Sequence, residues 1–484
     1  MKRLISVLVA VLFMTGMVVA QNESDVSQTG NGNASTVDQS GINDAQVEQT
    51  TIGDDGNTAT ITQIGENYSG SNNGVPMDFD FTEDNGAGVL VEQIGDDNEV
   101  TATQDGSGNL ADFQQGYTVD EDGKKKEVAG VENEATLMQD GDNNYSIFRQ
   151  GGEGNVADFS ILGSNNTTEL YQALTGVGVE NTSKVDIMGN ENEVLSNQRG
   201  FNNVLKGLNG DYFMIDGDGN DVDAYQHGDG NGSMIEGNIV GNDNTAYMEQ
   251  AGQDHEIELD VNGTGNDANV EQYGNGGHGQ SWTTEREIGK KAGENNKAVL
   301  TQHGNNNDLD VEQIGEDNES SIDQGGWKNS AENLQEGDNN TSIIHQRMSN
   351  EANVDQIGND NYSNVDQMGY NTADVTQNGN ENEADVDQWG YSQNASITQE
   401  SNDNDAKIVQ EENDPGENAE GNESTIHQYI GDNNLAENYQ YGSDNTSSIR
   451  QNMGSNEAFV TQDGDGNWSR VNQGGYFNES DVLQ

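Results

Sequence analysis

A glutamine recurs every eleven residues through long parts of this chain. Two uninterrupted runs show the spacing: Gln302, Gln313, Gln324, Gln335 and Gln346, and then Gln440, Gln451, Gln462, Gln473 and Gln484. A fixed short period is typical of repeat architectures, in which each unit packs mainly against its neighbours. The spacing therefore predicts a stack of small, nearly equivalent units.

The repeated unit reads Asn-x-small-x-aliphatic-x-Gln-x-Gly-x-x, as in the segment from Asn382 to Gly390. Marked residues at every second position indicate a β-strand with one face turned inward. Gly then opens a tight turn, where positive φ angles are needed. The predicted fold class is all-β: a β-solenoid (β-helix) of about twenty two-strand coils, each coil made of two eleven-residue strand-turn units.

The inward face of such a coil carries Asn and Gln beside small and aliphatic residues. A buried amide without a partner costs about 1–3 kcal/mol, so these side chains need hydrogen bonds. Stacked coils supply them when each amide lies over the same amide of the next coil, as in cross-β ladders. The residues predicted to form this structural ladder and its turns are Gln302, Gln313, Gln324, Gln346, Gln356, Gln367, Gln377, Gln388, Gln399, Gln451, Gln462, Gln473, Asn371, Asn382, Asn467, Gly369, Gly379 and Gly390.

Residues 1–20 have the pattern of a secretory signal peptide. Lys2 and Arg3 precede an apolar stretch, and Val18-Val19-Ala20 forms a small-residue cleavage site. An uncleaved membrane anchor is the alternative interpretation. Residues 21–484 are then almost entirely repeat.

The repeat is interrupted near residues 67–88, 117–132, 276–294 and 411–421, which are predicted to be loops inserted at corners of the solenoid. The pattern also decays near residues 152–263. Ile161 and Ile187 take glutamine positions there, and Gly237 stands where Gln or Gly is expected. This middle stretch is expected to stack less regularly.

Composition limits the partners of the chain. It contains 87 Asp and Glu against 18 Lys and Arg, a formal charge of −69, which argues against nucleic acid. It has no cysteine, so disulfides and thiolate metal sites are excluded. Hydrophobic residues make up only 30%, a level typical of disorder, but 2 prolines and the strict spacing oppose that interpretation. No cofactor is predicted.

Acidic residues occupy outward positions, as at Asp385 and Asp387. They are interpreted as a solvated face that limits aggregation; the alternative is that divalent cations bridge acidic rows of neighbouring coils. The segment from Asp216 to Asp223 resembles a calcium loop but lacks the closing Glu of an EF-hand. No catalytic motif is found, and because the units are interchangeable none offers the single special place that an enzyme needs. The chain is predicted not to be an enzyme.

The repeat, as read in residues 371–377 and 382–390, resembles the curlin repeat of bacterial curli fibres, although this chain is longer and more acidic than the better-known curlins. The resemblance implies a secreted structural subunit of extracellular amyloid fibres in a Gram-negative bacterium, used in biofilm matrix and surface adhesion. It also implies self-association, a curlin-like nucleator and an outer-membrane secretion pore. A monomeric β-solenoid adhesin that binds a surface or a glycan, in a calcium-dependent manner or not, is the alternative.

Overall fold

A computed structural model describes residues 22–41, 43–51, 56–66, 88–119, 125–127, 130–172, 180–208, 212–273, 293–411 and 420–484. These residues form strands joined by short turns, and none of them is helical. Accordingly, no helix suited to crossing a membrane occurs in the described part of the chain. The predicted signal peptide, residues 1–20, lies outside it. The all-β prediction is confirmed.

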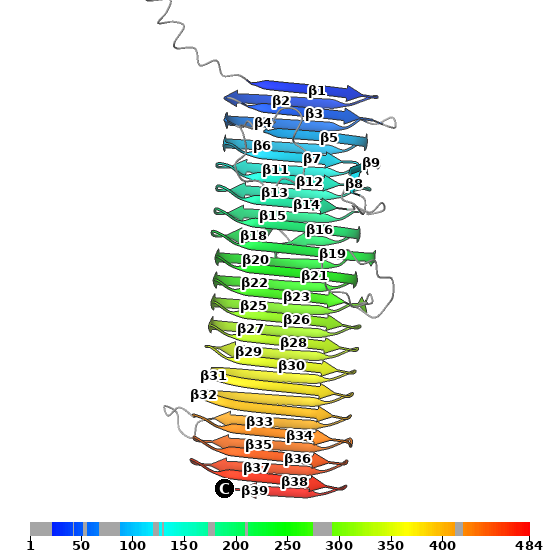
Figure 1. Cartoon of the computed structure of the whole chain (residues 1–484). Coiled ribbons are helices and arrows are strands. Elements are labelled where there is room, and N and C mark those ends of the chain that lie inside the picture. The colour runs from blue at the N-terminus through cyan, green and yellow to red at the C-terminus, as the bar shows by residue number, and fades with distance from the viewer. Residues whose placement is uncertain are drawn as a thin grey trace, which may run out of the picture.

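The strands form a straight rod of parallel stacks that runs from the N-terminal coil to the C-terminal coil (Figure 1). Strand pairings skip alternate strands, as in β1–β3 and β2–β4, so each coil contributes to two stacks.

Stack one contains β1 (Glu23–Thr29), β3 (Asp44–Thr50), β5 (Val89–Asp96), β7 (Leu110–Gln115), β12 (Tyr145–Gln150), β14 (Thr167–Gln172), β16 (Glu193–Phe201), β19 (Asp221–Asn231), β21 (Thr245–Gln253), β23 (Asp267–Tyr273), β26 (Asp308–Ile314), β28 (Ser330–Glu336), β30 (Glu351–Ile357), β34 (Glu423–Tyr429), β36 (Thr446–Asn452) and β38 (Trp468–Gly474). Stack two contains β2 (Ala34–Gly41), β4 (Thr58–Glu66), β6 (Glu99–Ser107), β11 (Glu134–Asp140), β13 (Val156–Leu162), β15 (Thr182–Met188), β17 (Val204–Lys206), β18 (Phe213–Asp216), β20 (Met234–Asn242), β22 (Glu256–Thr264), β25 (Lys297–Asn305), β27 (Glu319–Trp327), β29 (Thr341–Arg347), β33 (Asp405–Glu411), β35 (Leu435–Tyr441), β37 (Glu457–Asp463) and β39 (Glu479–Leu483).

The remaining strands depart from this plan. β31 (Tyr362–Asn378) and β32 (Glu383–Glu400) each continue through a corner and belong to both stacks. Two short strands, β10 (Gly130–Val131) and β24 (Gly293–Glu294), pair with β5 and β21. β8 (Tyr117–Val119) and β9 (Lys125–Glu127) form a separate antiparallel pair.

The solenoid has about 17 turns, so the predicted count of about twenty coils was too high. The predicted two-strand coil of two eleven-residue units is matched only in part. Ladder residues of successive coils are often 22 residues apart, but 21 in places and 26 or 28 elsewhere. Inserted residues therefore lengthen several coils, and the whole rod is roughly 80 Å long at about 4.8 Å per coil.

The core lies between the two stacks, and the alternation of the sequence sets it. In β29 and β37 every second residue is buried, and its neighbours lie on the outer face. The innermost residues are mostly Ala, Ser, Val and Ile, which are small enough for the two inner faces to meet. Aromatic rings enter at a few coils: Phe148 stacks on Phe113 at 5.0 Å and meets Phe159 edge to face at 4.9 Å.

The predicted loop insertions fall largely on residues that the structure does not describe, namely 67–87, 120–124, 128–129, 274–292 and 412–419. Within the range 117–132 it does describe β8 and β9.

In the stretch 152–263, strand pairing continues through every coil. The irregularities have local causes. β17 and β18 share one level of stack two, and the register between β16 and β19 shifts after Arg199. Gly237 makes room for Phe213, since a Cβ there would lie 2.7 Å from the Phe213 ring.

Candidate functional site: side-chain ladders and coil ends

Stack one carries an unbroken ladder of glutamine side chains. Each Nε2 donates to the Oε1 of the glutamine in the next coil, as from Gln313 to Gln335 at 2.8 Å and from Gln356 to Gln377 at 2.9 Å. The second N–H group donates to a backbone oxygen of the facing strand, as from Gln356 to Thr341 at 2.9 Å. The ladder runs through Gln28, Gln49, Gln93, Gln115, Gln150, Gln172, Gln198, Gln226, Gln250, Gln272, Gln313, Gln335, Gln356, Gln377, Gln399, Gln428, Gln451 and Gln473.

Stack two carries a second glutamine ladder that is interrupted once. Its first part contains Gln39, Gln63, Gln104 and Gln139, and its second part contains Gln302, Gln324, Gln346, Gln367, Gln388, Gln410, Gln440, Gln462 and Gln484. Between them the register places Ile161, Ile187, Ile215, Ile239 and Val261. The decay predicted at Ile161 and Ile187 thus belongs to one face of the rod only.

The interruption leaves a defect where the ladder resumes. Val261 lies over Gln302, so nothing donates to the Gln302 Oε1, which is buried without a hydrogen-bond partner. Gln302 still donates to Gln324 at 3.0 Å. Within the gap the apolar side chains need no hydrogen bonds. The free-energy cost of an unpaired amide oxygen arises at the edge of the gap, at the Gln302 Oε1.

Asparagine ladders at the strand starts have the opposite polarity. The backbone N–H of Asn318 donates to Oδ1 of Asn296 at 3.0 Å, and its Nδ2 donates to the same oxygen at 3.2 Å. Gln amides therefore donate toward the C-terminal end of the rod, whereas Asn amides donate toward the N-terminal end. The same bonds link Asn361 to Asn382 and Asn382 to Asn404.

One histidine replaces an asparagine in these ladders. His255 is 1% exposed; its Nδ1 accepts the backbone N–H of Asn296 at 3.2 Å, and its Nε2 lies 3.3 Å from the oxygen of Ala251. An Asn in this position makes equivalent bonds, as Asn155 does with the oxygen of Gly151. The ring must be neutral, with its proton on Nε2, to do so. Burial lowers the pKa of His255 to about 4, despite its contact with Ala251.

The structure places every predicted ladder residue on the inner face or at a corner. The glutamines lie in the two ladders, Gln302, Gln324 and Gln346 in stack two and Gln313, Gln356 and Gln377 in stack one. The backbone N–H groups of Asn371 and Asn467 donate to Oδ1 of Asn350 and Asn445. Gly369, Gly379 and Gly390 take φ angles of 129°, 149° and 141° at the turns.

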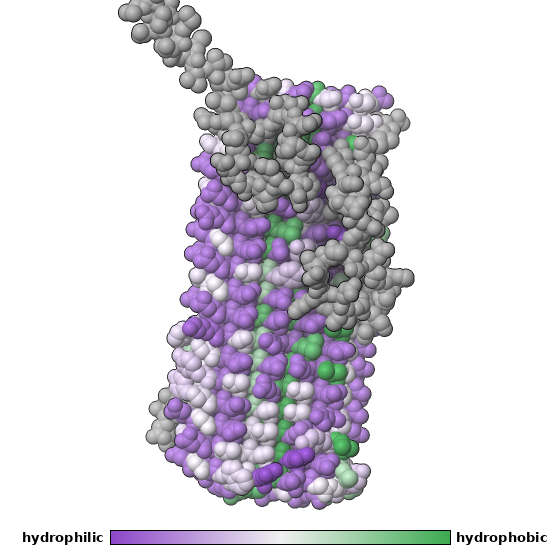
Figure 2. Space-filling model, in the orientation of Figure 1, coloured by the Kyte–Doolittle hydropathy of each residue, from purple (hydrophilic) through white to green (hydrophobic). Residues whose placement is uncertain are grey.

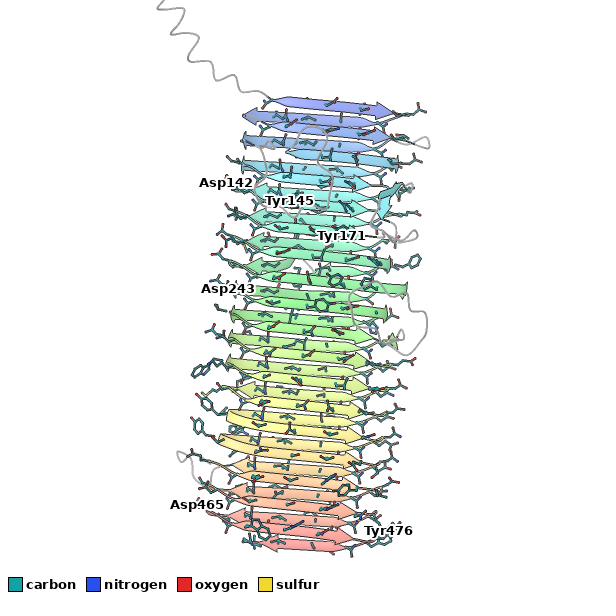
Figure 3. All side chains as sticks on the ribbon, viewed as in Figure 1. Asp142, Tyr145, Tyr171, Asp243, Asp465 and Tyr476 are labelled. Atoms are coloured by element: carbon teal, nitrogen blue, oxygen red, sulfur yellow. The ribbon has the colours of Figure 1, made fainter. Side chains whose placement is uncertain are left out.

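Two further ladders, at the corners, were missed by the sequence analysis. On the corner that leads from stack two to stack one, here called the Asp142 corner, side-chain oxygens accept the backbone N–H of the preceding coil. Examples are Asp142 with Ser107 at 2.8 Å and Asp218 with Asn190 at 2.7 Å. Asp142, Asp243 and Asp465 project from this edge in Figure 3. On the opposite, Asp338 corner, Asp338 accepts from Glu316 at 3.1 Å in the same way. In the sequence, the residues of these corner ladders are recognisable as Asp, Asn or Ser directly after the turn glycine.

These contacts explain the segments that resemble calcium loops. Asp218 and Asp465 use their carboxylates to accept backbone N–H groups of the neighbouring coil, and Asn220 belongs to the Asn ladder. Among the described residues, no cluster of three or more acidic, histidine or cysteine side chains is arranged to hold a metal ion.

Acidic side chains line the outer faces, and the visible face is mainly hydrophilic (Figure 2). Neighbouring coils hold these carboxylates close together. Burial, with Glu383 and Glu437 nearby, raises the pKa of Asp405 to about 6. Burial and Asp385 likewise raise the pKa of Asp387 to about 6, against the opposing effect of Lys407. The rows therefore repel each other at neutral pH.

The first and last coils expose strand edges and complementary ladder groups. By polarity, the last coil presents the amide nitrogens of Gln473 and Gln484 and the Oδ1 atoms of Asn467 and Asn478. The first coil presents the Oε1 atom of Gln28. Large apolar side chains at the last coil are strongly exposed, with Trp468 at 64% and Leu483 at 80%. Each end therefore has the groups that the other end would pair with.

Comparison with known families gives one result. The curlin associated repeat matches residues 217–252, 241–274, 292–315, 371–400 and 379–411. No curated protein matches the sequence. The matches cover coils within the gap of the stack-two glutamine ladder, which contain Ile239 and Val261, and coils after it. Curlin repeats are structural rather than catalytic. The resemblance found in the sequence is thereby confirmed: five stretches of the chain match the curlin associated repeat.

Proposed function

We propose that this chain is a secreted structural subunit of extracellular curli-like amyloid fibres, which contribute to biofilm matrix and surface adhesion. The observation that carries the proposal is the unbroken glutamine ladder of stack one through the described coils, with opposite Gln and Asn polarity at the two ends. A coil that ends in open strand edges can pair with another coil of the same repeat. A nucleator and a secretion pore of the curlin type form part of this proposal.

The repeat defines how two subunits would join. Continuing the register from the last coil onto the first coil of a second copy places β38 beside β1 and β39 beside β2. Gln473 then meets Gln28, so the glutamine ladder of stack one crosses the junction. On the outer face Arg470 lies opposite Asp25, which pairs a cation with an acid in a chain that has few cations.

A charge-reversal series tests this junction. Arg470→Asp should slow fibre growth, followed by dye binding and electron microscopy, because it places two carboxylates opposite each other. The double variant Arg470→Asp with Asp25→Arg should restore growth. Arg450→Asp is the matched control, since the exposed Arg450 lies over the Tyr429 ring one coil before the last and does not face the junction.

Two results would contradict the proposal. If Arg470→Asp fibres grow as fast as the parent, the ends do not meet in this register. If the parent chain stays monomeric at high concentration, the adhesin alternative replaces the fibre subunit.

A further inference from the structure

An uncharged aromatic patch interrupts the Asp142 corner in four successive coils, from β27 to β32. It consists of Trp327, Met348, Met368, Tyr370, Trp389 and Tyr391, and is here called the aromatic corner. All but Tyr391 are 40–50% exposed. In other described coils the position after the turn glycine, which Trp327, Tyr370 and Tyr391 occupy here, holds polar residues such as Ser107, Asn190 and Ser443. The column of Met368 and Trp389 also contains exposed apolar residues in other coils, such as Ile64 and Leu162. Rings project from this edge of the rod beside the yellow coils (Figure 3).

The side chains of the aromatic corner form two columns along the rod. In one, the register places Arg347, Met368 and Trp389 over one another. In the other, Tyr370 lies over Tyr391 with ring centroids 5.7 Å apart. Trp327 lies on the same line toward β27, with Ser349 between it and Tyr370: the backbone N–H of Ser349 donates to the carbonyl oxygen of Trp327. The patch is thus a continuous surface roughly 15 Å long at about 4.8 Å per coil.

The composition of the patch is that of a protein interface. Trp, Tyr, Met and Arg are enriched at interface cores, whereas Asp and Glu are depleted there. None of the six residues carries a charge, in a chain whose formal charge is −69. Two copies of this chain repel each other across their acidic faces, but not across this corner.

The ends of the patch are oppositely charged. Arg347 and Lys328 lie at the β27–β29 end, and Glu411 follows Gln410 at the other end, beyond Trp389. Arg347 also pairs with Asp323 at 2.7 Å. An antiparallel twofold contact would place the cationic end of one copy against Glu411 of the other, with the Met and Trp side chains packed between them. A twofold contact requires this kind of self-complementary surface.

We propose that the aromatic corner is a lateral docking surface for a second copy of this chain, arranged antiparallel, and that it bundles fibres side by side. This inference rests on the proposed fibre function. A patch of this length buries too little area for a strong dimer. Along a fibre, however, it recurs once per subunit with the same spacing in each partner fibre, so that many weak contacts act together.

The bundling test uses the variant Trp389→Ser with Tyr370→Asn, which installs the residues that other coils carry at these two positions as Ser40 and Asn190. Electron microscopy should show fibres of normal length and number but without bundles. The control is Ile430→Asn, which removes a 72% exposed apolar side chain from the opposite corner and should leave bundles intact. Bundles that persist in the double variant would overturn the proposal, as would equal loss in the control.

A second measurement does not depend on fibre growth. Because the chain has no cysteine, Met368→Cys gives a single reactive site at the centre of the patch. Treatment with a short bis-maleimide should link two copies, also in the Arg470→Asp background in which growth is slowed. Ser40→Cys, at the equivalent repeat position on β2, should give several-fold less product. Equal linking at both positions would contradict the lateral contact, whereas failure of fibre growth alone would count against the end-to-end junction.

Discussion

At the scale of single residues, the chain is stabilised by buried amides that pair with the same amide of the neighbouring coils and with backbone oxygens. A glutamine in the middle of a ladder accepts from one coil and donates to the next, so its removal leaves two neighbours unpaired. The edge of the gap in stack two differs, because Gln302 already has an unpaired Oε1. The free energy of unfolding that is lost when a glutamine is replaced should therefore depend on the position of that glutamine in the ladder.

Replacing Gln324 with Leu should destabilise its coils by about 1–3 kcal/mol more than replacing Gln302 with Leu. Gln324→Leu leaves an N–H of Gln302 and the Oε1 of Gln346 without their ladder partners. Gln302→Leu leaves the Oε1 of Gln324 without its ladder partner, and it removes the Gln302 Oε1, which was already unpaired. Hydrogen exchange of the amides in β27 and β29 measures the difference. Equal protection in the two variants would show that ladder continuity contributes little.

His255 makes stability depend on acid. Its folded-state pKa of about 4 lies below the ordinary value of 6.5, so the unfolded chain binds the proton first. The stability that the neutral ring supplies is present above pH 6.5 and is lost as the pH falls toward 4, by about 3 kcal/mol in all.

The variant His255→Asn should remove this loss while keeping the ladder. Its advantage over the parent, read from amide exchange in β20 and β22, should grow between pH 6.5 and 4. An advantage that is the same at both pH values would contradict the account.

At the scale of strands and turns, the corners constrain the chain most tightly. Gly241 has a φ of 124°, and a Cβ there would lie 1.7 Å from the oxygen of Gly263. Gly466 also has a positive φ, 68°, but a Cβ there would meet nothing within 4 Å. Glycine is thus required at position 241 by the close stacking of neighbouring turns as well as by the positive φ angle.

Gly241→Ala should therefore destabilise the central coils far more than Gly466→Ala destabilises the last ones. The control carries the ordinary cost of a positive φ, about 1–2 kcal/mol, and the test variant adds a steric clash with backbone. Chemical denaturation followed by circular dichroism compares the two. Similar losses would mean that the turns can separate without cost.

The acidic rows make the stability of the fold depend on pH in the opposite sense to His255. The folded-state pKa of Asp405 is raised to about 6, so its contribution to stability is greatest below the ordinary carboxyl pKa and is lost as the pH rises through 6. Asp405→Asn should therefore stabilise β33 at pH 7 and have little effect at pH 4, as measured by thermal unfolding at the two pH values. A gain at pH 4 as large as at pH 7 would exclude charge repulsion as the cause.

Much of this architecture was readable in the sequence, because one face of every strand repeats. The positions of Gln388 and Gly390 define a strand and a turn wherever they recur, which was enough to predict a β-solenoid. The number of coils was overestimated, since residues inserted between coils were counted as coils. The run from Ile161 to Val261 also could not be assigned to one face, because the period alone does not distinguish the two stacks.

The corner ladders were missed for a different reason. Asp and Asn at exposed turn positions are usual in any loop, so Asp142 and Asp338 carried no special signal. Their role depends on the backbone N–H of the neighbouring coil, which only the stacking brings within reach. The aromatic corner, similarly, becomes visible only when Met368 and Trp389 are known to lie over one another.

At the scale of the whole molecule, the rod is polar, and its two ends are complementary. Its glutamine and asparagine ladders donate in opposite directions, its outer faces repel other copies, and its ends expose complementary strand edges. A particle with these properties should grow in length, whereas contact between its sides should be confined to places without carboxylates.

Cryo-electron microscopy of fibres grown from the chain without residues 1–20 tests the central claim most directly. The account predicts a continuous rod in which the coil spacing of about 4.8 Å is unbroken at the junction and Gln473 lies over Gln28 of the next subunit. Fibres in which the rods meet without strand pairing, or in which the chain has refolded away from the solenoid, would contradict it.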